Sequence, residues 1–340
     1  MTQITTLIPA YKKDYLGPLF LALRRQSFKD FKVILSDDSP GGVITDMIRN
    51  KHFGNLTSEL NLLVVPGPKN ARQNHQQLLD LWANQSPLVH FNLDDDLIYP
   101  DFYRTHVAAH LAAPCSVTIS QRWLSHDDGV PAWTLPLPDF VHESPGHLIQ
   151  PTTEELFTST VGRCENWLGE LSNMVMSAEG AVCYPKPPTT DLSYYALLDI
   201  GFVLNASQTL PVTFIREYLS VFRQNPQQTT QNTHSHGGRV GFLAWVAYAL
   251  AAWRDGHLTA QQAIAAIGEA TRRVVHHFSD DPVVAEYFAI LDHHADTLEH
   301  LYTAFRDFWL RLLASHPGTA PLQAKPVAQT GLSELAQECA

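Results

Sequence analysis

The chain has 340 residues, 45% of them hydrophobic, which is enough for one large domain with an appendage or for two modest domains. Its formal net charge is −11, from 34 acidic and 23 basic residues, so no broad cationic surface is available to bind a nucleic-acid backbone. We therefore exclude nucleic acid as a partner. A small anionic ligand remains compatible, because a bound cation can compensate its charge locally.

The cysteine spacing and the apolar runs bear on location. Cysteines at 115, 164, 183 and 339 form neither a CxxC pair nor a disulfide scaffold, which predicts a reducing, cytoplasmic setting. The first residues lead directly into a strand-like run, so no secretory signal is expected. The longest uncharged run, at 240–253, is shorter than the ~20 residues of a membrane-spanning helix. We expect a buried helix there and no transmembrane segment.

The first hundred residues alternate short apolar runs with amphipathic stretches, a pattern typical of parallel strands joined by helices. We expect strands at Ile4–Ile8, Lys32–Leu35, Asn61–Val65 and Leu88–Leu93, and helices at Leu16–Gln26 and Arg72–Asn84. The strands end at the polar or turn-forming clusters PAYKK, SDDSPGG, PGPKN and DDD. In open α/β sheets ligands bind beyond the carboxyl ends of the strands, so these clusters are expected to form one site.

The rest of the chain is mixed and then helical. Between 115 and 235 we expect a strand at Ser116–Ser120, a proline-rich excursion at 131–151, and helices near 153–160 and 190–200. From Gly241 to Leu313 periodic Ala-rich and Leu-rich stretches predict helices that break at Gly256 and Pro282. Residues 316–340 are rich in Pro, Ala, Gln and Thr, which predicts a tail or linker. We thus divide the chain into 1–235, 236–315 and 316–340, a division also compatible with further domains of a longer parent protein.

Three carboxylates stand in a row at Asp94, Asp95 and Asp96, directly after the apolar run LVHFNL. Adjacent carboxylates repel one another and resist desolvation, so such a site becomes favourable mainly when a hard cation is bound. Its oxygen ligands suit Mg²⁺ or Mn²⁺. A solvated acidic turn is the alternative. The position after a buried strand, with Pro100 four residues later, favours the metal site.

A second acidic pair, Asp37 and Asp38, closes the second expected strand and precedes Ser39, Pro40 and two glycines. Carboxylates at this place can accept hydrogen bonds from a ribose or from a base N–H, as in other nucleotide-binding α/β folds. Ordinary turn chemistry accounts for the same residues. The motif alone leaves both interpretations open.

Taken in order, the runs TLIPAYKK, KVILSDDSP and HFNLDDDLIYPDF resemble the opening strand, the nucleotide-binding aspartates and the DXD metal motif of family 2 glycosyltransferases with the GT-A fold. The resemblance covers roughly residues 1–225. It implies an α/β, Rossmann-like and mostly parallel central sheet flanked by helices, here with a C-terminal helical appendage. It also implies an inverting enzyme that uses Mn²⁺ or Mg²⁺ and moves a sugar from a UDP-, GDP- or dTDP-sugar to a hydroxyl of a glycan, lipid-linked or protein acceptor. Such an enzyme is expected in the cytoplasm, and a peripheral position at the inner membrane face is compatible.

The resemblance implies a donor site built from strand ends and one helix start. Asp94 and Asp96 would be the DXD metal pair, with Asp96 the better candidate, and Asp95 stays open because the triplet permits either register. The other donor contacts would come from Pro9, Ala10 and Tyr11 at the base, Asp37 and Asp38 at the base or ribose, Arg72 and Asn74 at the helix start, and Arg223 near the diphosphate. Lys12 departs from the family, which often has Asn there, and Asn225 replaces a histidine.

The acceptor side shows a Gly-Glu-x-Ser pattern at 169–172, and the run at 189–201 resembles the helix whose leading Asp is the usual catalytic base. The resemblance implies that Asp191 takes the acceptor hydroxyl proton as that oxygen attacks the anomeric carbon, with Glu170 the next candidate. A helix N-cap role for Asp191 is equally compatible. Trp167, Tyr194 and Tyr195 are candidates to stack on acceptor sugars, with core packing as the alternative.

Two other functions compete with this interpretation. A sugar nucleotidyltransferase would carry a glycine-rich loop with a basic residue after the first strand, and IPAYKKDYLG lacks those glycines. A non-catalytic carbohydrate-binding or scaffold module with the same fold would have no need of the acidic triplet. Both are therefore less favoured than the transferase.

Overall fold

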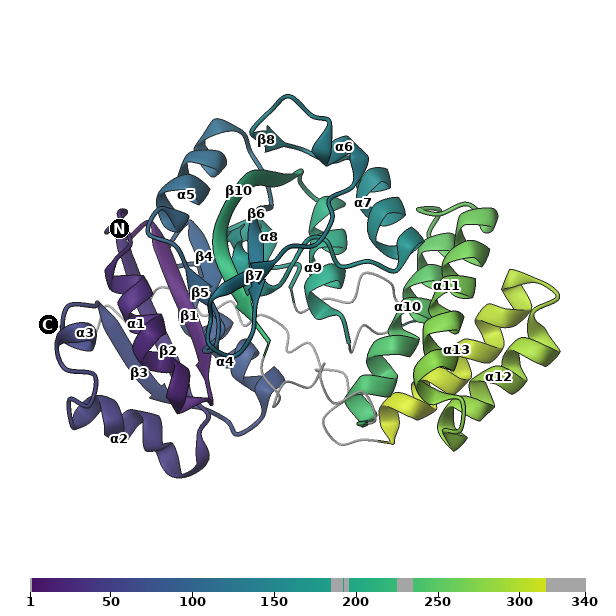
Figure 1. The fold of residues 1–340 in the computed structure, drawn as a ribbon, viewed down its shortest axis with the longest axis horizontal. Coiled ribbons are helices and arrows are strands. Elements are labelled where there is room, and N and C mark those ends of the chain that lie inside the picture. Colours follow the sequence, from purple (N-terminus) through teal and green to yellow (C-terminus); the bar gives the residue numbers. More distant parts are fainter. Residues whose placement is uncertain (1, 185–191, 193–195, 225–234, 316–340) are drawn as a thin grey trace, which may run out of the picture.

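The computed structural model describes residues 2–184, 192, 196–224 and 235–315 (Figure 1). Within these residues ten strands form one sheet, in the order β3-β2-β1-β4-β9-β6-β10-β5, with β7 paired to β6 and β8 paired to β10. The strands are β1 (Ile4–Ala10), β2 (Phe31–Asp37), β3 (Leu62–Pro66), β4 (Leu88–Phe91), β5 (Leu97–Ile98), β6 (Val117–Ser125), β7 (Pro131–Trp133), β8 (Leu148–Ile149), β9 (Met174–Ser177) and β10 (Val212–Arg223).

The N-terminal half of the sheet is parallel, as the sequence predicts. Strand β1 pairs in parallel with β2 on one side and with β4 on the other, and β2 pairs in parallel with β3. The register aligns Ala10 with Asp37 and Leu7 with Phe91, so the carboxyl ends of these strands meet at one edge. Strands β2 and β3 are added on one side of β1 and β4 is added on the other side. Open α/β sheets form their ligand crevice at such a change of side.

The other half of the sheet is mixed. Strand β9 lies antiparallel between β4 and β6, whereas β10 runs parallel to β6 and carries register shifts around Tyr218. Strand β6 continues to Ser125, five residues beyond the end expected from the sequence. Strands β6 and β10 therefore both reach the edge that carries the acidic triplet.

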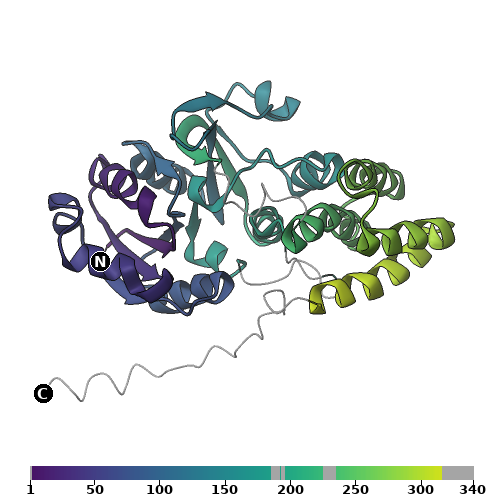
Figure 2. The same cartoon turned by 60° about the horizontal axis from the view of Figure 1, so that its bottom comes forward.

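Helices cover both faces of the sheet (Figures 1 and 2). Leu19 and Phe20 of α1 and Phe102 of α5 share one buried cluster with β1 and β2, whereas Leu78 of α4 and Phe202 of α9 belong to a second cluster on the other face. The helices preceding the C-terminal region are α1 (Leu16–Arg24), α2 (Val43–Arg49), α3 (Asn55–Ser58), α4 (Ala71–Trp82), α5 (Phe102–Ala112), α6 (Asp139–His142), α7 (Thr153–Thr160), α8 (Ala178–Ala181) and α9 (Leu198–Ser207), with 3₁₀ turns at Lys13–Tyr15, Pro40–Gly42, Val161–Arg163 and Leu171–Asn173.

The C-terminal region is helical, as expected: α10 (His236–Arg254), α11 (Ala260–Phe278), α12 (Pro282–His294) and α13 (Leu298–Ala314). The predicted breaks are confirmed, because Gly256 has a positive φ of 79° between α10 and α11, and Pro282 opens α12. The apolar stretch 240–253 is a buried helix that belongs to the same hydrophobic cluster as Phe214 of the sheet. Nowhere in the described ranges is a helix long and apolar enough to cross a bilayer.

Candidate functional site

The acidic triplet follows β4 and is almost completely buried, with exposures of 5%, 4% and 1% for Asp94, Asp95 and Asp96. The backbone N–H groups of Tyr11 and Lys12 each donate to Asp94 Oδ2 at 2.6 Å. The Lys12 ammonium forms an ion pair with Asp95 Oδ2. The end of β1 therefore holds two of the three carboxylates, and the solvated acidic turn considered above is excluded.

Asp96 carries a fully buried carboxylate oxygen that has no hydrogen-bond partner. Oδ1 accepts from the Arg223 backbone N–H at 3.1 Å, whereas the buried Oδ2 has no hydrogen-bond partner. Burial, together with the Asp95 charge, raises the pKa of Asp96 well above its usual value. The same two causes raise the pKa of Asp94 to about 6. A cation at this place would relieve both penalties.

The triplet fits a divalent ion that is shared with a ligand. Over the described part of the chain, no group of three or more His, Cys, Asp or Glu side chains has the arrangement of a metal site. Mg²⁺ in nucleotide enzymes is usually held by one or two carboxylates together with substrate phosphates. The unpartnered Asp96 oxygen meets that requirement for one carboxylate, and Asp94, two residues earlier in the chain, is the candidate for the second.

The two residues of the second acidic pair, Asp37 and Asp38, have different surroundings. Ser39 N donates to Asp37 Oδ1 at 3.0 Å, and Thr45 N donates to Oδ2 at 2.8 Å, with both hydroxyls adding further bonds. Burial alone would raise the pKa of Asp37, but the Ser39 and Thr45 hydrogen bonds lower it below its usual value. Both oxygens of Asp37 are thus engaged in the turn, so Asp38 is the better placed of the two for a nucleotide.

Asp38 and the triplet lie on either side of the end of β1. The Asp38 N–H donates to the Ala10 carbonyl at 2.8 Å, and the next residue, Tyr11, is one of the donors to Asp94. Asp38 Oδ1 also accepts from the Lys69 N–H, and a Cβ placed on Gly67 would approach Oδ1 to 2.7 Å. The two acidic motifs therefore share one edge of the sheet, as the sequence predicts.

The other predicted donor residues surround this edge. Ala10 is buried, Pro9 is partly buried and the Tyr11 side chain is 60% exposed, so Tyr11 is free to contact a base. Asn70 caps α4 by accepting from Gln73 N at 3.0 Å. The first turn of α4 carries the partly exposed Arg72 and the buried Asn74, whose Oδ1 has no partner. A helix N-terminus favours anions.

Arg223, at the end of β10, closes the triplet from the other side. Its Nε donates to the Asp95 carbonyl at 2.8 Å, and its Nη1 donates to the Asp127 carbonyl at 2.5 Å. The carbon of its guanidinium group lies 4.8 Å from the ring centre of Tyr15. Arg223 as a whole is 4% exposed. Arg223 thus fixes the loop that carries the triplet, while its predicted contact with a diphosphate stays a prediction.

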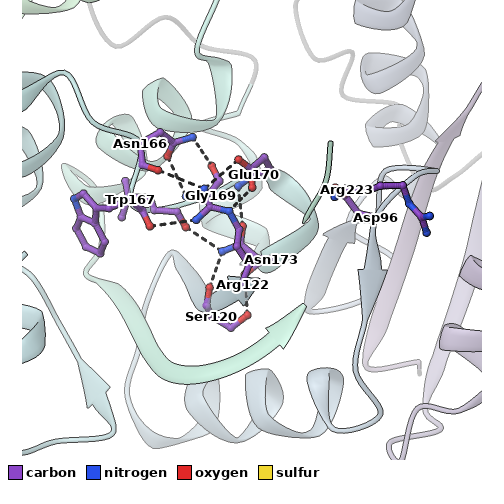
Figure 3. A network of polar contacts seen from close by, with 10 residues as sticks. Asp96, Ser120, Arg122, Asn166, Trp167, Gly169, Glu170, Asn173 and Arg223 are labelled. Atoms are coloured by element: carbon purple, nitrogen blue, oxygen red, sulfur yellow. Dashed lines mark hydrogen bonds and ion pairs between the residues drawn. The ribbon is translucent and has the colours of Figure 1, made fainter. Parts of the chain in front are cut away.

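Glu170 lies in a dense polar network (Figure 3). Arg122 Nε is 2.5 Å from Glu170 Oε2, and Nη2 donates to Oε1 at 3.1 Å. Asn173 Oδ1 accepts from the Glu170 N–H at 2.7 Å, and Gly169, with φ of 114°, passes so close that a Cβ would meet Asn173 Oδ1 at 2.2 Å. The ion pair with Arg122 makes Glu170 a weaker candidate for the base than an unpaired carboxylate would be.

Ser172, in the turn that follows Glu170, connects this turn by a hydrogen bond to Leu93, the residue before the triplet. Ser172 Oγ accepts from Leu93 N at 3.1 Å, and its carbonyl is 3.1 Å from His90 Nε2. Burial lowers the pKa of His90 to about 3, so the ring is neutral. A carbonyl only accepts, so Nε2 carries the proton and Nδ1 accepts from the Tyr103 hydroxyl at 3.1 Å.

Asp199 is a carboxylate that the sequence interpretation missed. It lies in the first turn of α9 and is partly exposed. Burial and, to a lesser extent, the Glu170 charge raise its pKa to about 7, although Arg122 and the Leu171 N–H act in the opposite direction. A helix was expected near 190–200, but α9 begins at Leu198. An acidic residue before the apolar run IGFVLNA was the available signal, because carboxylates are favoured in the first turn of a helix.

The predicted acceptor residues have different outcomes. Asp191, Tyr194 and Tyr195 lie outside the described residues, and their roles stay predictions. Trp167 is 3% exposed, and its ring packs edge-on against Phe214 while Nε1 donates to Ser159 at 3.1 Å. The Trp167 side chain therefore packs in the core, the alternative stated above, and its contact with an acceptor stays a prediction.

Comparisons with known proteins were made for sequence and for structure. No protein-family profile and no curated protein sequence matches the chain. Solved structures do match. The structure of S. aureus TarS shares 14% identity over 92% of this chain, with a TM-score of 0.57, and this chain spans about half of that one (55%). The structure of TarS 1-349 in complex with UDP-GlcNAc shares 12% identity over 95% of this chain and 98% of that one, with a TM-score of 0.54.

A third match is weaker. The mannosyltransferase PcManGT from Pyrobaculum calidifontis, in complex with GDP-Man and Mn²⁺, shares 13% identity over 92% of this chain and 85% of that one, with a TM-score of 0.49, too low to establish a shared fold. The TarS matches cover 92% and 95% of the chain. The expected α/β fold, a GT-A-like and mostly parallel sheet with helices and a C-terminal helical region, is thus confirmed.

Proposed function

We propose that the chain is an inverting glycosyltransferase of the DXD-containing family 2 type, which transfers a sugar from a nucleotide-sugar donor to an acceptor hydroxyl. The observation that carries the proposal is the convergence of Asp38 and Asp96 on one sheet edge, where Asp96 keeps a buried oxygen without a partner. The TarS structures that share this fold were solved with UDP and with UDP-GlcNAc, which supports a nucleotide-sugar ligand.

The donor would lie across the end of β1. Asp38 would accept from the ribose or base, Tyr11 would cover the base, and the start of α4, with Arg72, would face the negatively charged phosphates. Asp96 and Asp94 would hold Mn²⁺ or Mg²⁺ there, an ion whose charge stabilises the departing diphosphate. The nucleotide could be UDP, GDP or dTDP, and Tyr11 and Asp38 are the residues that would select it.

The general base would be Asp199 among the described residues, with Asp191 and Glu170 as the alternatives. During transfer the acceptor oxygen attacks the anomeric carbon, the bond from that carbon to the diphosphate oxygen breaks, and the hydroxyl proton passes to the base. A base works best with a pKa near the working pH, and the pKa of Asp199 is about 7. Glu170 is paired with Arg122, so it would be a positioning residue and would not accept the proton itself.

Calorimetric titration with UDP, GDP and dTDP, each with and without Mn²⁺, tests the proposal. We expect one nucleotide to bind in a Mn²⁺-dependent manner and Asp96→Ala to abolish that dependence. Asp30→Ala is the matched control, because it removes an exposed carboxylate that precedes β2 and so lies at the opposite edge of the sheet. Failure of all three nucleotides to bind with Mn²⁺ would refute the proposal. Nucleotide binding without hydrolysis or transfer of any sugar donor would instead indicate a non-catalytic module.

A further inference from the structure

Two aromatic side chains form a stacked pair beside the site. Trp123 of β6 and Tyr218 of β10 have ring centres 4.5 Å apart and an interplanar angle of 26°, and both residues are partly exposed. The register shifts of β10 on either side of Tyr218 place this residue opposite Gln121, so Gln121, Trp123 and Tyr218 stand close together on the sheet. No role described so far uses this pair.

A hollow lies beside Tyr218, one member of this pair. Its lining includes Gln121 and Arg122 of β6, Tyr218 of β10, and Thr134 of the segment that follows β7. In the described part of the structure, the side-chain polar atoms of Gln121, Thr134 and Tyr218 make no hydrogen bonds. An amide and two hydroxyls are therefore available to a ligand at the edge of two aromatic rings.

The hollow is joined to the proposed catalytic carboxylates through Arg122. The Arg122 guanidinium binds Glu170, and it also donates to the carbonyl of Trp167, another residue of the lining. Glu170 in turn acts electrostatically on both Asp96 and Asp199. Trp123 stands two residues before the end of β6, or about 7 Å along the strand, and the paired end of β10 binds Asp96.

We propose that the Trp123–Tyr218 pair and the Gln121 and Thr134 side chains form the acceptor subsite, and that its ligand is a neutral sugar ring. The inference rests on the proposed function and names its acceptor class. A sugar ring offers an apolar C–H face to an aromatic ring and hydroxyls at its rim, which matches rings bordered by neutral hydrogen-bonding groups.

The charges of the site favour a neutral ligand over an anionic one. Arg122 is the cationic residue of the lining, and its three nitrogens already face Glu170 and the carbonyls of Trp167 and Asn166. Among the described residues that line the hollow, none offers an uncommitted cation to a phosphate group, and Glu170 would repel it. The site therefore favours a neutral saccharide acceptor over a phosphorylated one.

The experiment uses saturation-transfer NMR on the full chain with methyl glycosides of glucose, galactose, mannose and N-acetylglucosamine, in the presence of UDP and Mn²⁺. We expect at least one glycoside to bind, with Trp123→Ala weakening it about three- to tenfold, while Trp123→Phe, which keeps an aromatic face, weakens it less. Tyr218→Phe should weaken it through loss of the hydroxyl. Tyr99→Phe is the matched control, since Tyr99 is partly exposed and is not part of the lining.

Titration of UDP against each variant separates this inference from the proposed function. Unchanged UDP affinity in Trp123→Ala shows that the variant is folded and that the loss is confined to the sugar. Absence of binding by all four glycosides overturns the inference, as does binding that Trp123→Ala leaves unchanged or that glycerol phosphate replaces. Glycoside binding without any nucleotide binding would refute the transferase and leave the sugar subsite standing.

Discussion

Asp199→Asn provides a test of the proposed base that can be made on stability as well as on activity. The pKa of Asp199 is raised from an ordinary value of 3.8 to about 7, mainly by burial. Asparagine has the same shape and keeps a carbonyl oxygen for the Leu171 N–H, but it does not titrate. The variant therefore removes the proton equilibrium with little change in packing.

The sign of the effect follows from linkage. Between pH 4 and pH 7 the folded protein holds a proton on Asp199 and the unfolded chain does not, so the free energy of unfolding falls as the pH rises. The full difference of about 3 pKa units corresponds to at most roughly 4 kcal/mol. Over pH 4.5 to 7.5 the wild type should lose up to about 3 kcal/mol that Asp199→Asn does not lose. Other buried carboxylates titrate in both proteins and cancel in the comparison.

Urea unfolding of both proteins at pH 4.5, 6.0 and 7.5 measures this difference. In parallel, kcat/KM for transfer should rise with pH through about 7 in the wild type, because the base must be deprotonated, and should fall about 100- to 10,000-fold in Asp199→Asn. Identical pH dependence of unfolding in both proteins would refute the assigned environment of Asp199. Near-normal turnover of Asp199→Asn, together with an inactive Asp191→Asn, would return the base to Asp191.

Three further substitutions test other parts of the site. Gly169→Ala forces a side chain into a backbone with φ of 114° and against Asn173, so urea unfolding should show a loss of at least about 2 kcal/mol, whereas Gly241→Ala, with nothing within 4 Å of its Cβ, should be neutral or slightly stabilising. Gly67→Ala places a Cβ 2.7 Å from Asp38 Oδ1 and should weaken nucleotide binding about tenfold in calorimetry; unchanged affinity would remove Asp38 from the donor site. Lys12→Met removes the Lys12–Asp95 ion pair and should lower stability by roughly 1–3 kcal/mol, less than for a fully buried pair because the Lys12 side chain is 22% exposed. Added Mn²⁺ should restore more stability in this variant than in Lys13→Met, the control at an exposed lysine.

The parallel half of the sheet could be predicted because its signals are local. Each of the strands β1, β2, β3 and β4 is a short apolar run that stops at a turn-forming cluster, and the parallel arrangement fixes which ends meet. That geometry brought Asp38 and Asp94 to one edge without any knowledge of contacts. The mixed half offered no such rule, because β9 and β10 pair with strands distant in the chain and β10 changes register at Tyr218.

The residue types predicted the acidic motifs, but not which aspartate of each motif binds the protein itself and which one is available to a ligand. Asp37 and Asp38 are adjacent and chemically identical, yet Ser39 and Thr45 engage both oxygens of the first. The position of Asp199 in the first turn of α9, which begins at Leu198, likewise could not be read from the sequence, where a helix was expected near 190–200. Such choices depend on which backbone N–H groups reach a carboxylate, which a sequence pattern does not specify.

Lys12 departs from the family pattern, and its ion pair with Asp95 explains why a lysine is favourable there. Three buried carboxylates in succession are unfavourable unless positive charge or N–H dipoles reach them. In this chain the N–H groups of Tyr11 and Lys12 reach Asp94, the Lys12 ammonium reaches Asp95, and the Arg223 N–H reaches Asp96. Every member of the triplet is thus supported, and Asp96 Oδ2 is the fully buried oxygen of the described triplet that has no hydrogen-bond partner. The lysine therefore supplies part of the compensation that a bound cation would provide, which predicts that ligand-free protein tolerates this acidic edge and that the demand for metal is concentrated on Asp96.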